Sequence, residues 1–132
     1  MSKALRLEAR PVHLGRGATA VPQPTFTGLA WYDEYGARHA ADGAEGRLVS
    51  AFRFTADWDS WEMHPSGAEV VVCVAGAMTL HQQHADGRAA SVTIAAGEYA
   101  INPPGTWHTA DVAGEASVVF ITPGLGTEVR PR

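Results

Sequence analysis

The sequence has only one cysteine, no cluster of lysine or arginine, and no long apolar stretch. The single cysteine, Cys73, excludes an internal disulfide framework. Its place inside an apolar run indicates a small buried side chain rather than a nucleophile. The net charge of −4, with no basic patch, argues against a nucleic acid as partner.

Segments that would enter or cross a membrane are also missing. The longest apolar run, residues 70–78, is far shorter than the roughly 18 residues expected of a membrane span. Residues 1–15 lack the apolar core of a signal peptide. We therefore expect a cytoplasmic protein with no membrane partner.

Glycine and proline are plentiful and scattered, with 14 and 8 residues among 132. This distribution indicates short strands joined by turns within one domain, residues 1–132. We expect an N-terminal arm over 1–26 and a barrel core over about 47–122. A single helix is predicted from Thr27 to Ala41, with Thr27 as its N-cap and with Leu29, Tyr32 and Tyr35 along one stripe.

The segments after residue 46 have the composition and spacing of β-strands. Alternating apolar residues and β-branched runs are separated by turn residues, of which Asp86-Gly87 is the strongest hairpin signal. The predicted strands are 48–54, 57–64, 69–75, 78–84, 89–94, 97–102, 107–111 and 116–121, with short edge strands at 12–14 and 19–21 and a bend or bulge at Gly76. Roughly eight strands with almost no helix predict an all-β antiparallel sandwich or barrel.

Two segments bring together residue types that bind metals. Glu62 and His64 are two residues apart on a strand and so share a face, and the turn after His64 allows Glu69 to face the same interior. A proline-rich turn, Pro103 to Gly105, precedes His108 and delivers it toward the mouth of the barrel.

These segments resemble the two motifs of the cupin superfamily. The family forms are G-x5-H-x-H-x(3,4)-E-x6-G and G-x5-P-x-G-x2-H-x3-N. Here E-x-H-x4-E-x6-G spans Glu62 to Gly76, and G-x5-P-x-G-x2-H spans Gly97 to His108. The WEMHP and ITPGLGTE segments resemble small single-domain bacterial cupins. The resemblance implies a cupin-type jelly-roll barrel and a homodimer that pairs through edge strands, with the N-terminal segment able to swap.

Carried over by position, the resemblance places the metal ligands on His64, Glu69 and His108. Glu62 stands where the family has its first histidine, Ala56 where motif 1 has its first glycine, and Val112 where motif 2 has asparagine. Glu62 is therefore either a fourth metal ligand or a catalytic base and substrate acceptor beside the ion. A solvated glutamate at a strand edge is the plain alternative.

Two histidines and a carboxylate suit a divalent ion with open coordination positions. Fe²⁺ or Mn²⁺ is favoured, and Zn²⁺ or Ni²⁺ is compatible with the ligand set. The leading hypothesis is a metal-dependent enzyme of dioxygenase type that acts on an oxygenated small molecule. The alternatives are a metal-stabilised binding or sensor module without turnover, and a scaffold barrel with an empty pocket.

Other residues have less distinctive roles. Asn102 and Gln82 share the interior face and are candidates for orienting a substrate. Strand parity turns Trp61 and Trp107 away from the metal, toward packing or a dimer interface. Met78 and Leu80 are expected to line the barrel. The remaining histidines are expected to be exposed: His13, His39, His81 and His84.

Overall fold

The computed structural model describes residues 3–132, and its strands are antiparallel throughout. The strands are β1 (Val12–Gly15), β2 (Thr19–Pro22), β3 (Arg47–Phe54), β4 (Ser60–Met63), β5 (Glu69–Gln83), β6 (Ala89–Ala95), β7 (Tyr99–Asn102), β8 (Trp107–Asp111), β9 (Ala116–Thr122) and β10 (Glu128–Pro131). One α-helix, α1 (Ala30–Arg38), and two 3₁₀ turns, Arg16–Ala18 and Ala40–Glu45, complete the described part. The predicted all-β fold with one short helix is confirmed.

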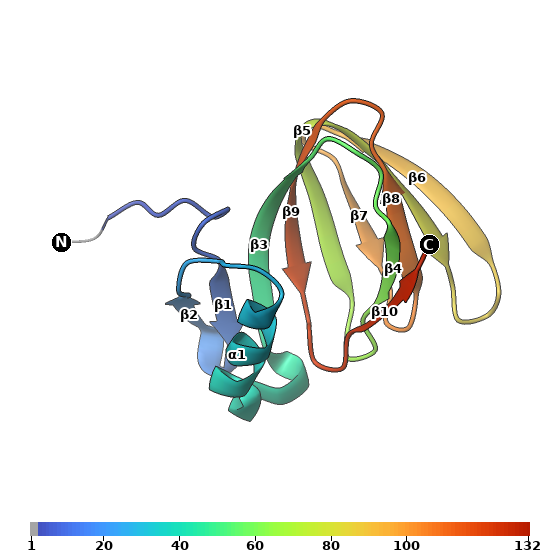
Figure 1. Ribbon diagram of the computed structural model, residues 1–132. Helices are drawn as coiled ribbons and strands as arrows, with labels where there is room; N and C mark the ends of the chain where they lie inside the picture. Colours follow the sequence, from blue (N-terminus) through green and yellow to red (C-terminus); the bar gives the residue numbers. More distant parts are fainter. Residues whose placement is uncertain (1–2) are drawn as a thin grey trace.

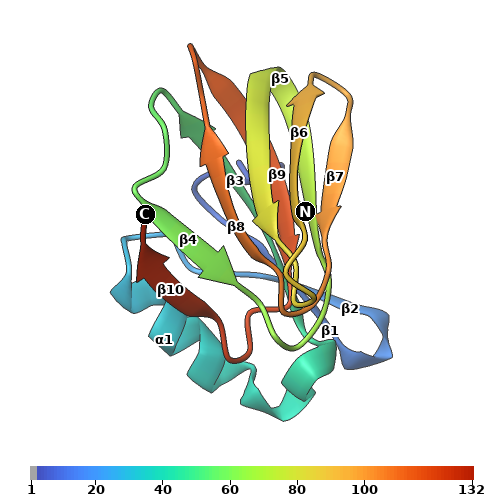
Figure 2. The same ribbon diagram turned by 90° about the vertical axis from the view of Figure 1, so that its right-hand side faces the viewer.

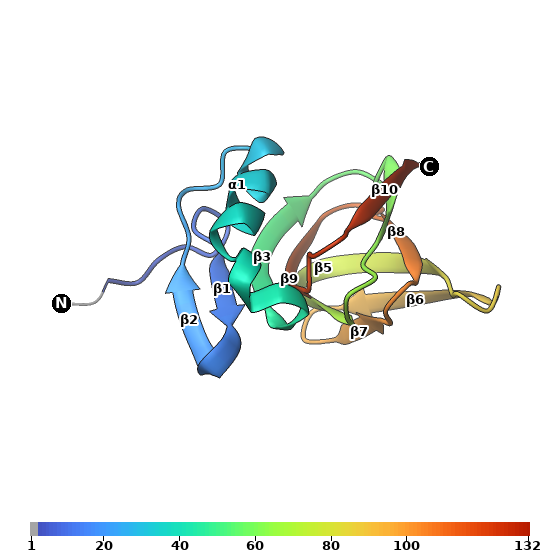
Figure 3. The same ribbon diagram turned by 90° about the horizontal axis from the view of Figure 1, so that it is seen from below.

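The strands run in the order β10-β4-β8-β5-β9-β3-β1-β2, and β6 and β7 also pair with β5. Figures 1 and 2 show these strands curving into a barrel, with β1, β2 and α1 beside it. Seen from below in Figure 3, β3 and β9 lie on one side of the barrel and β4 and β10 on another.

The long strand β5 closes the barrel because it belongs to both sheets. Its first half pairs with β7 and β9, and its second half pairs with β6 and β8. The sequence predicted two strands here, 69–75 and 78–84. The chain instead continues as one strand, with a register shift between Cys73 and Ala75 and a positive φ of 71° at Gly76. The bulge bends the strand without ending it.

The helix is shorter than predicted. Gly28, at φ 130°, keeps the chain out of helical geometry, so α1 begins after Leu29 and Thr27 is not its N-cap. Trp31 is the buried residue of α1, and its Nε1 donates to the carbonyl of Pro24 at 3.1 Å. Leu29, expected on the apolar stripe, is 87% exposed.

The interior of the barrel is filled by apolar side chains from the middle and late strands. Met78 and Leu80 line it as predicted, and Cys73 is fully buried among them. The other core residues are Val71, Ile94, Ala110, Val112, Ala116, Val118 and Phe120.

The final strand, β10, was not anticipated. It pairs with β4, setting Val129 opposite Glu62 and Arg130 opposite Trp61. The Arg130 guanidinium lies 4.3 Å from the centre of the Trp107 ring and 5.5 Å from that of Trp61. Both tryptophans therefore pack on an arginine.

No helix of residues 3–132 is long and apolar enough to cross a membrane. The cytoplasmic location and the single domain expected from the sequence stay predictions.

The glycine that ends the first motif is expected to be essential for folding. A Cβ at Gly76 would lie 1.9 Å from the carbonyl oxygen of Glu115, and its φ is positive. We expect Gly76→Ala to lower the free energy of unfolding by at least about 3 kcal/mol, measured by urea denaturation. Gly87→Ala is the matched control, since φ there is also positive but no atom lies within 4 Å of the added Cβ. It should cost about 1 kcal/mol, and equal losses in the two variants would refute the steric explanation.

Candidate metal centre

Four side chains from three strands and a turn converge at one end of the barrel. Glu62 is on β4, His64 follows that strand, Glu69 begins β5, and His108 is on β8. Glu62 and His108 are directly paired across β4 and β8. The structure thus brings together the four residues predicted to bind the metal.

Glu69 lies between the two histidines. Its Oε2 is 3.2 Å from Nε2 of His64, and its Oε1 is 3.2 Å from Nε2 of His108. Oε2 of Glu62 lies 4.0 Å and 3.9 Å from the same two nitrogens. The side chains of His64, Glu69 and His108 are buried, whereas that of Glu62 is 37% exposed. Glu62 is therefore the member of the group that solvent or a ligand reaches first.

The hydrogen bonds behind the histidines fix which nitrogen faces the site. Thr127 donates its hydroxyl hydrogen to the carbonyl of Gly124, so its oxygen accepts from Nδ1 of His64 at 2.8 Å. Nδ1 of His108 faces the carbonyl of Thr106 at 3.4 Å, and a carbonyl can only accept. Each ring thus carries its proton on Nδ1 and presents the Nε2 lone pair to the site, as metal-binding histidines do.

Both Nε2 atoms are buried and have no hydrogen-bond partner among residues 3–132. Each lies 3.2 Å from a carboxylate oxygen of Glu69 without the alignment of a hydrogen bond, and a neutral imidazole there would turn its lone pair toward an acceptor. A divalent cation among these atoms turns that repulsion into attraction. The donor set therefore fits a metal ion.

Glu69 is held from behind by three polar side chains. Asn102 donates to its Oε1 at 3.0 Å, and Thr122 donates to its Oε2 at 2.7 Å. Gln82 in turn donates to the Asn102 side chain at 2.8 Å and to the Ile101 carbonyl. Asn102 and Gln82 are buried, as the strand parity predicted, but they lie behind Glu69 and do not line the cavity that opens beside the site between α1 and the barrel. Their contact with a substrate stays a prediction, and the geometry supports a role in orienting Glu69.

The charges of the site influence one another strongly. Burial alone would raise the pKa of Glu69, but the His108 and His64 imidazoles hold it well below its usual range. Burial and the charge of Glu69 raise the pKa of Glu62. Burial would lower the pKa of His108, but Glu69 and then Glu62 raise it. The carboxylates thus favour a positive charge between them, which a metal ion supplies when it is bound.

A cavity of about 1090 Å³ lies between α1 and the barrel, with Glu62, His64 and Glu69 among its lining residues. Residues of α1, β3 and the loop before β10 form its other walls. Tyr32 reaches it from α1, and burial together with the carboxylates of Glu62 and Glu69 raises the pKa of Tyr32 to about 12. Its phenol therefore keeps its proton at neutral pH.

The prediction that His13 is exposed is wrong, because this side chain is 2% exposed. Its Nδ1 lies 2.6 Å from the Tyr35 hydroxyl, its Nε2 lies 2.6 Å from Oδ2 of Asp42, and His39 stacks on its ring at 3.8 Å. The ligating atoms of His13, His39 and Asp42 are close together, but both nitrogens of His13 already have partners. We interpret the group as a set of side-chain contacts that holds α1 against β1.

His39, His81 and His84 are only partly exposed, contrary to expectation. His81, for example, contacts Ser91 and Asp111 on the neighbouring strands.

Three contributors to the site escaped the sequence analysis: Tyr32, Thr122 and Thr127. The two threonines belong to the ITPGLGTE segment, whose resemblance to small cupins gives no sign that their hydroxyl groups face the site. Tyr32 was assigned to a helix stripe, with no signal that the helix faces the site.

Comparison with solved structures identifies similar folds at low sequence identity. A recombinant oxalate oxidase in complex with glycolate matches with a TM-score of 0.57 and 18% identity, over 72% of this chain and 50% of that chain. A mutant of Bacillus subtilis oxalate decarboxylase matches with a TM-score of 0.54 and 13% identity, over 73% of this chain and 26% of that chain. A hydroquinone 1,2-dioxygenase in complex with Cd²⁺ and 4-hydroxybenzonitrile matches with a TM-score of 0.53 and 13% identity, over 58% of this chain and 56% of that chain.

In each case the match spans little more than half of the other protein or less. These likenesses therefore establish the fold alone. No protein-family model and no curated protein matches the chain.

The hydroxyl group behind Glu69 gives a test of the site that does not depend on activity. We expect Thr122→Val to weaken Zn²⁺ binding about 10- to 100-fold, because the Glu69 carboxylate loses a donor that orients it. Competition titration with a chelating dye measures the affinity. Thr79→Val, at an exposed hydroxyl that faces Thr93 on β6, is the control and should leave it unchanged. Unaltered affinity in the Thr122 variant would contradict the assigned role.

Proposed function

This chain has the cupin fold, and we propose that it binds one divalent metal ion through His64, Glu69 and His108. Glu62 is either the fourth ligand or a base beside the ion. The supporting observation is the pair of buried Nε2 atoms that face the Glu69 oxygens without a hydrogen bond. Polar atoms in such a place are stable only with a cation or proton between them.

The ligand set favours Fe²⁺ or Mn²⁺. One or two carboxylates with two imidazoles give a harder donor set than the all-nitrogen or sulfur sites that zinc commonly occupies. Zn²⁺ and Ni²⁺ remain compatible, because affinity order and metal supply also decide occupancy.

We further propose that the protein is an enzyme of dioxygenase type acting on an oxygenated small molecule. A metal bound by a two-histidine, one-carboxylate set supplies open positions for substrate and O₂. Glu62, partly exposed within the cavity, can accept a proton from a substrate hydroxyl, and Tyr32 can donate a hydrogen bond to a substrate oxygen. Solved structures of similar fold include a hydroquinone 1,2-dioxygenase and an oxalate oxidase, which supports this class of chemistry.

The alternative is a metal-stabilised binding or sensor module without turnover. It is favoured by the position of Glu62, which lies within about the same distance of both histidines and can close the coordination sphere. A filled four-ligand sphere is typical of structural metal sites.

Metal content and oxygen consumption together test the proposal. We expect about one metal ion per chain in the purified protein and at least a tenfold loss of affinity in His108→Ala, because a buried ligand is removed. Elemental analysis and chelator competition measure both. His81→Ala, at a histidine outside the site, is the matched control.

The same samples separate the two functions. The iron-loaded protein should consume O₂ with at least one of a panel of diketones, catechols and flavonols, and His108→Ala should not. Stoichiometric metal without any O₂ uptake across the panel would leave the binding module as the function, and absence of metal would overturn both.

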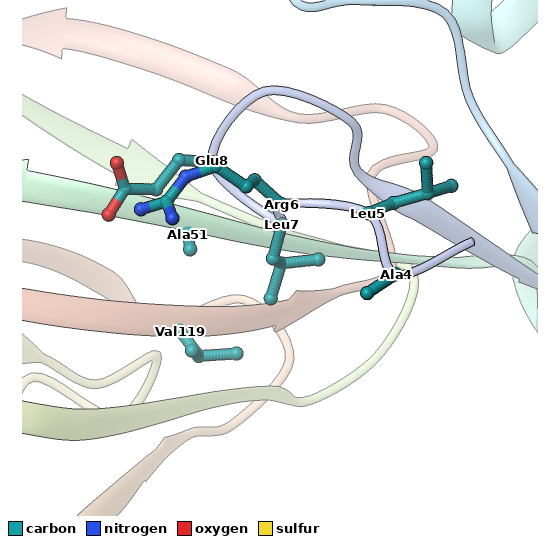
Figure 4. A pocket seen from close by; sticks show the side chains of 7 residues that line it. All are labelled: Ala4, Leu5, Arg6, Leu7, Glu8, Ala51 and Val119. Atoms are coloured by element: carbon teal, nitrogen blue, oxygen red, sulfur yellow. The ribbon is translucent and has the colours of Figure 1, made fainter.

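We also propose that two copies form a homodimer through the outer face of the sheet that contains β5, β7 and β9. Tyr99 and Ile101 are exposed side by side on β7, opposite Val72 and Val70 of β5. The N-terminal residues 4–8 cross this face further along, and Leu7 points toward Val119 beside a small cavity of about 440 Å³ (Figure 4). An apolar surface of this kind on both copies suits a two-fold interface.

Sedimentation velocity tests the dimer. We expect a dimer at micromolar concentration and a monomer in the double variant Tyr99→Glu, Ile101→Glu, because the carboxylates would be buried without partners. Thr93→Glu, at an exposed position on the outer face of β6, is the control. A monomeric parent protein would refute the proposal.

A further inference from the structure

We propose that the cavity beside the metal centre selects an uncharged, ring-bearing ligand and disfavours carboxylate anions. This inference deepens the proposed function and rests on it where the metal contributes. It follows from the shape, the lining and the charge of the cavity.

One wall of the cavity is a continuous row of aromatic rings. Phe26 contacts Phe52 edge to face at 5.6 Å, Phe52 lies 6.1 Å from Phe54, and Phe54 lies 5.5 Å from Trp58. The Trp58 ring is 6.2 Å from that of His108. All four of these aromatic side chains line the cavity, so the row leads from the α1 side to the metal ligands. A flat ring placed against this wall gains apolar burial and aromatic contacts.

The charges in the cavity are almost all negative. Its acidic lining residues are Asp33, Asp57, Asp59, Glu62 and Glu69. Arg53 is the only lysine or arginine among the described residues that line it. That guanidinium is exposed and already forms an ion pair with Glu115. No free arginine or lysine of the described cavity walls is therefore available to receive a carboxylate.

A bound metal ion would not make the charge of the cavity positive. The carboxylates of Glu62 and Glu69 together cancel the charge of a divalent ion, so the occupied centre has no net positive charge to attract an anion. An anionic group elsewhere in the cavity would lose its hydration without gaining a partner. An uncharged ligand that meets the metal through hydroxyl or carbonyl oxygens avoids this cost.

The size of the cavity points the same way. At about 1090 Å³ it is at the upper end of small-molecule pockets, far larger than a two-carbon diacid needs. Oxalate, the compound named for two of the similar structures, would leave the aromatic wall uncovered.

The test compares two probes that differ by one carboxylate. Catechol and 3,4-dihydroxybenzoate share the ring and both chelating oxygens, but only the second carries a carboxylate at pH 7. Isothermal titration calorimetry of the Zn²⁺-loaded protein avoids turnover, because zinc has no redox chemistry. We expect catechol to bind at least tenfold more tightly than 3,4-dihydroxybenzoate. Equal affinities, tighter binding of the acid, or no binding of catechol would overturn the inference.

Two substitutions separate the contributions of charge and of the wall. Glu62→Gln removes one negative charge and should reduce the ratio of the catechol affinity to the 3,4-dihydroxybenzoate affinity at least threefold. Phe52→Leu should weaken both probes to a similar degree, since it removes a ring from the wall. Thr93→Ala, at an exposed position on β6 outside the cavity, is the control and should change neither. If Glu62→Gln left the ratio of the two affinities unchanged, the electrostatic argument would be wrong.

A metal-free arm keeps the inference distinct from the proposed function. If the protein takes up no Zn²⁺, the metal proposal fails. The carboxylates and the aromatic wall are still present, so 3,4-dihydroxybenzoate should still bind more weakly than catechol. If Zn²⁺ binds stoichiometrically but the acid is preferred, the metal site stands and the inference about the ligand is wrong.

Discussion

Glu69 places a carboxylate inside the barrel, beyond the reach of bulk water, and much of the surrounding structure serves to compensate it. An isolated buried charge costs several kcal/mol, so each oxygen needs partners. Asn102 and Thr122 supply one donor each, and the two imidazoles face the remaining side of the group. The partners come from β7, β8, β9 and the turn after β4. The fold is thus what concentrates compensating groups at one point.

Because these partners are themselves held, the geometry is stiff. Gln82 fixes Asn102, Thr127 fixes His64, and Thr106 orients His108. Glu62 alone is less constrained and partly exposed. The centre therefore combines three preorganised groups with one that can respond to a ligand, which suits both of the functions considered.

The local parts of this arrangement were predictable from the sequence, and the long-range parts were not. The spacing of Glu62, His64 and Glu69 across one turn and the proline-glycine turn before His108 predicted the group that the structure brings together. Strand periodicity also located most strands to within a few residues.

The failures share a physical origin. Thr127 bonds to His64 across 63 positions and Thr122 to Glu69 across 53, and a hydroxyl carries no local sign of such pairing. The burial of His13 depends on Tyr35 and Asp42 from the helical region, and the start of α1 depends on the backbone of Gly28. The strand β10 is largely exposed and polar, so its pairing with β4 left no alternation to detect.

The hydrogen bond between Thr127 and His64 has a consequence for the order of events in the cell. All four candidate ligands precede Thr127 in the chain, so each leaves the ribosome before the residue that orients His64. Strand β9 ends at Thr122, so at about 5–20 residues per second Thr127 is made within about a second of the last strand that the barrel needs besides β10. Selective binding of the ion is therefore expected only after β10 has closed against β4.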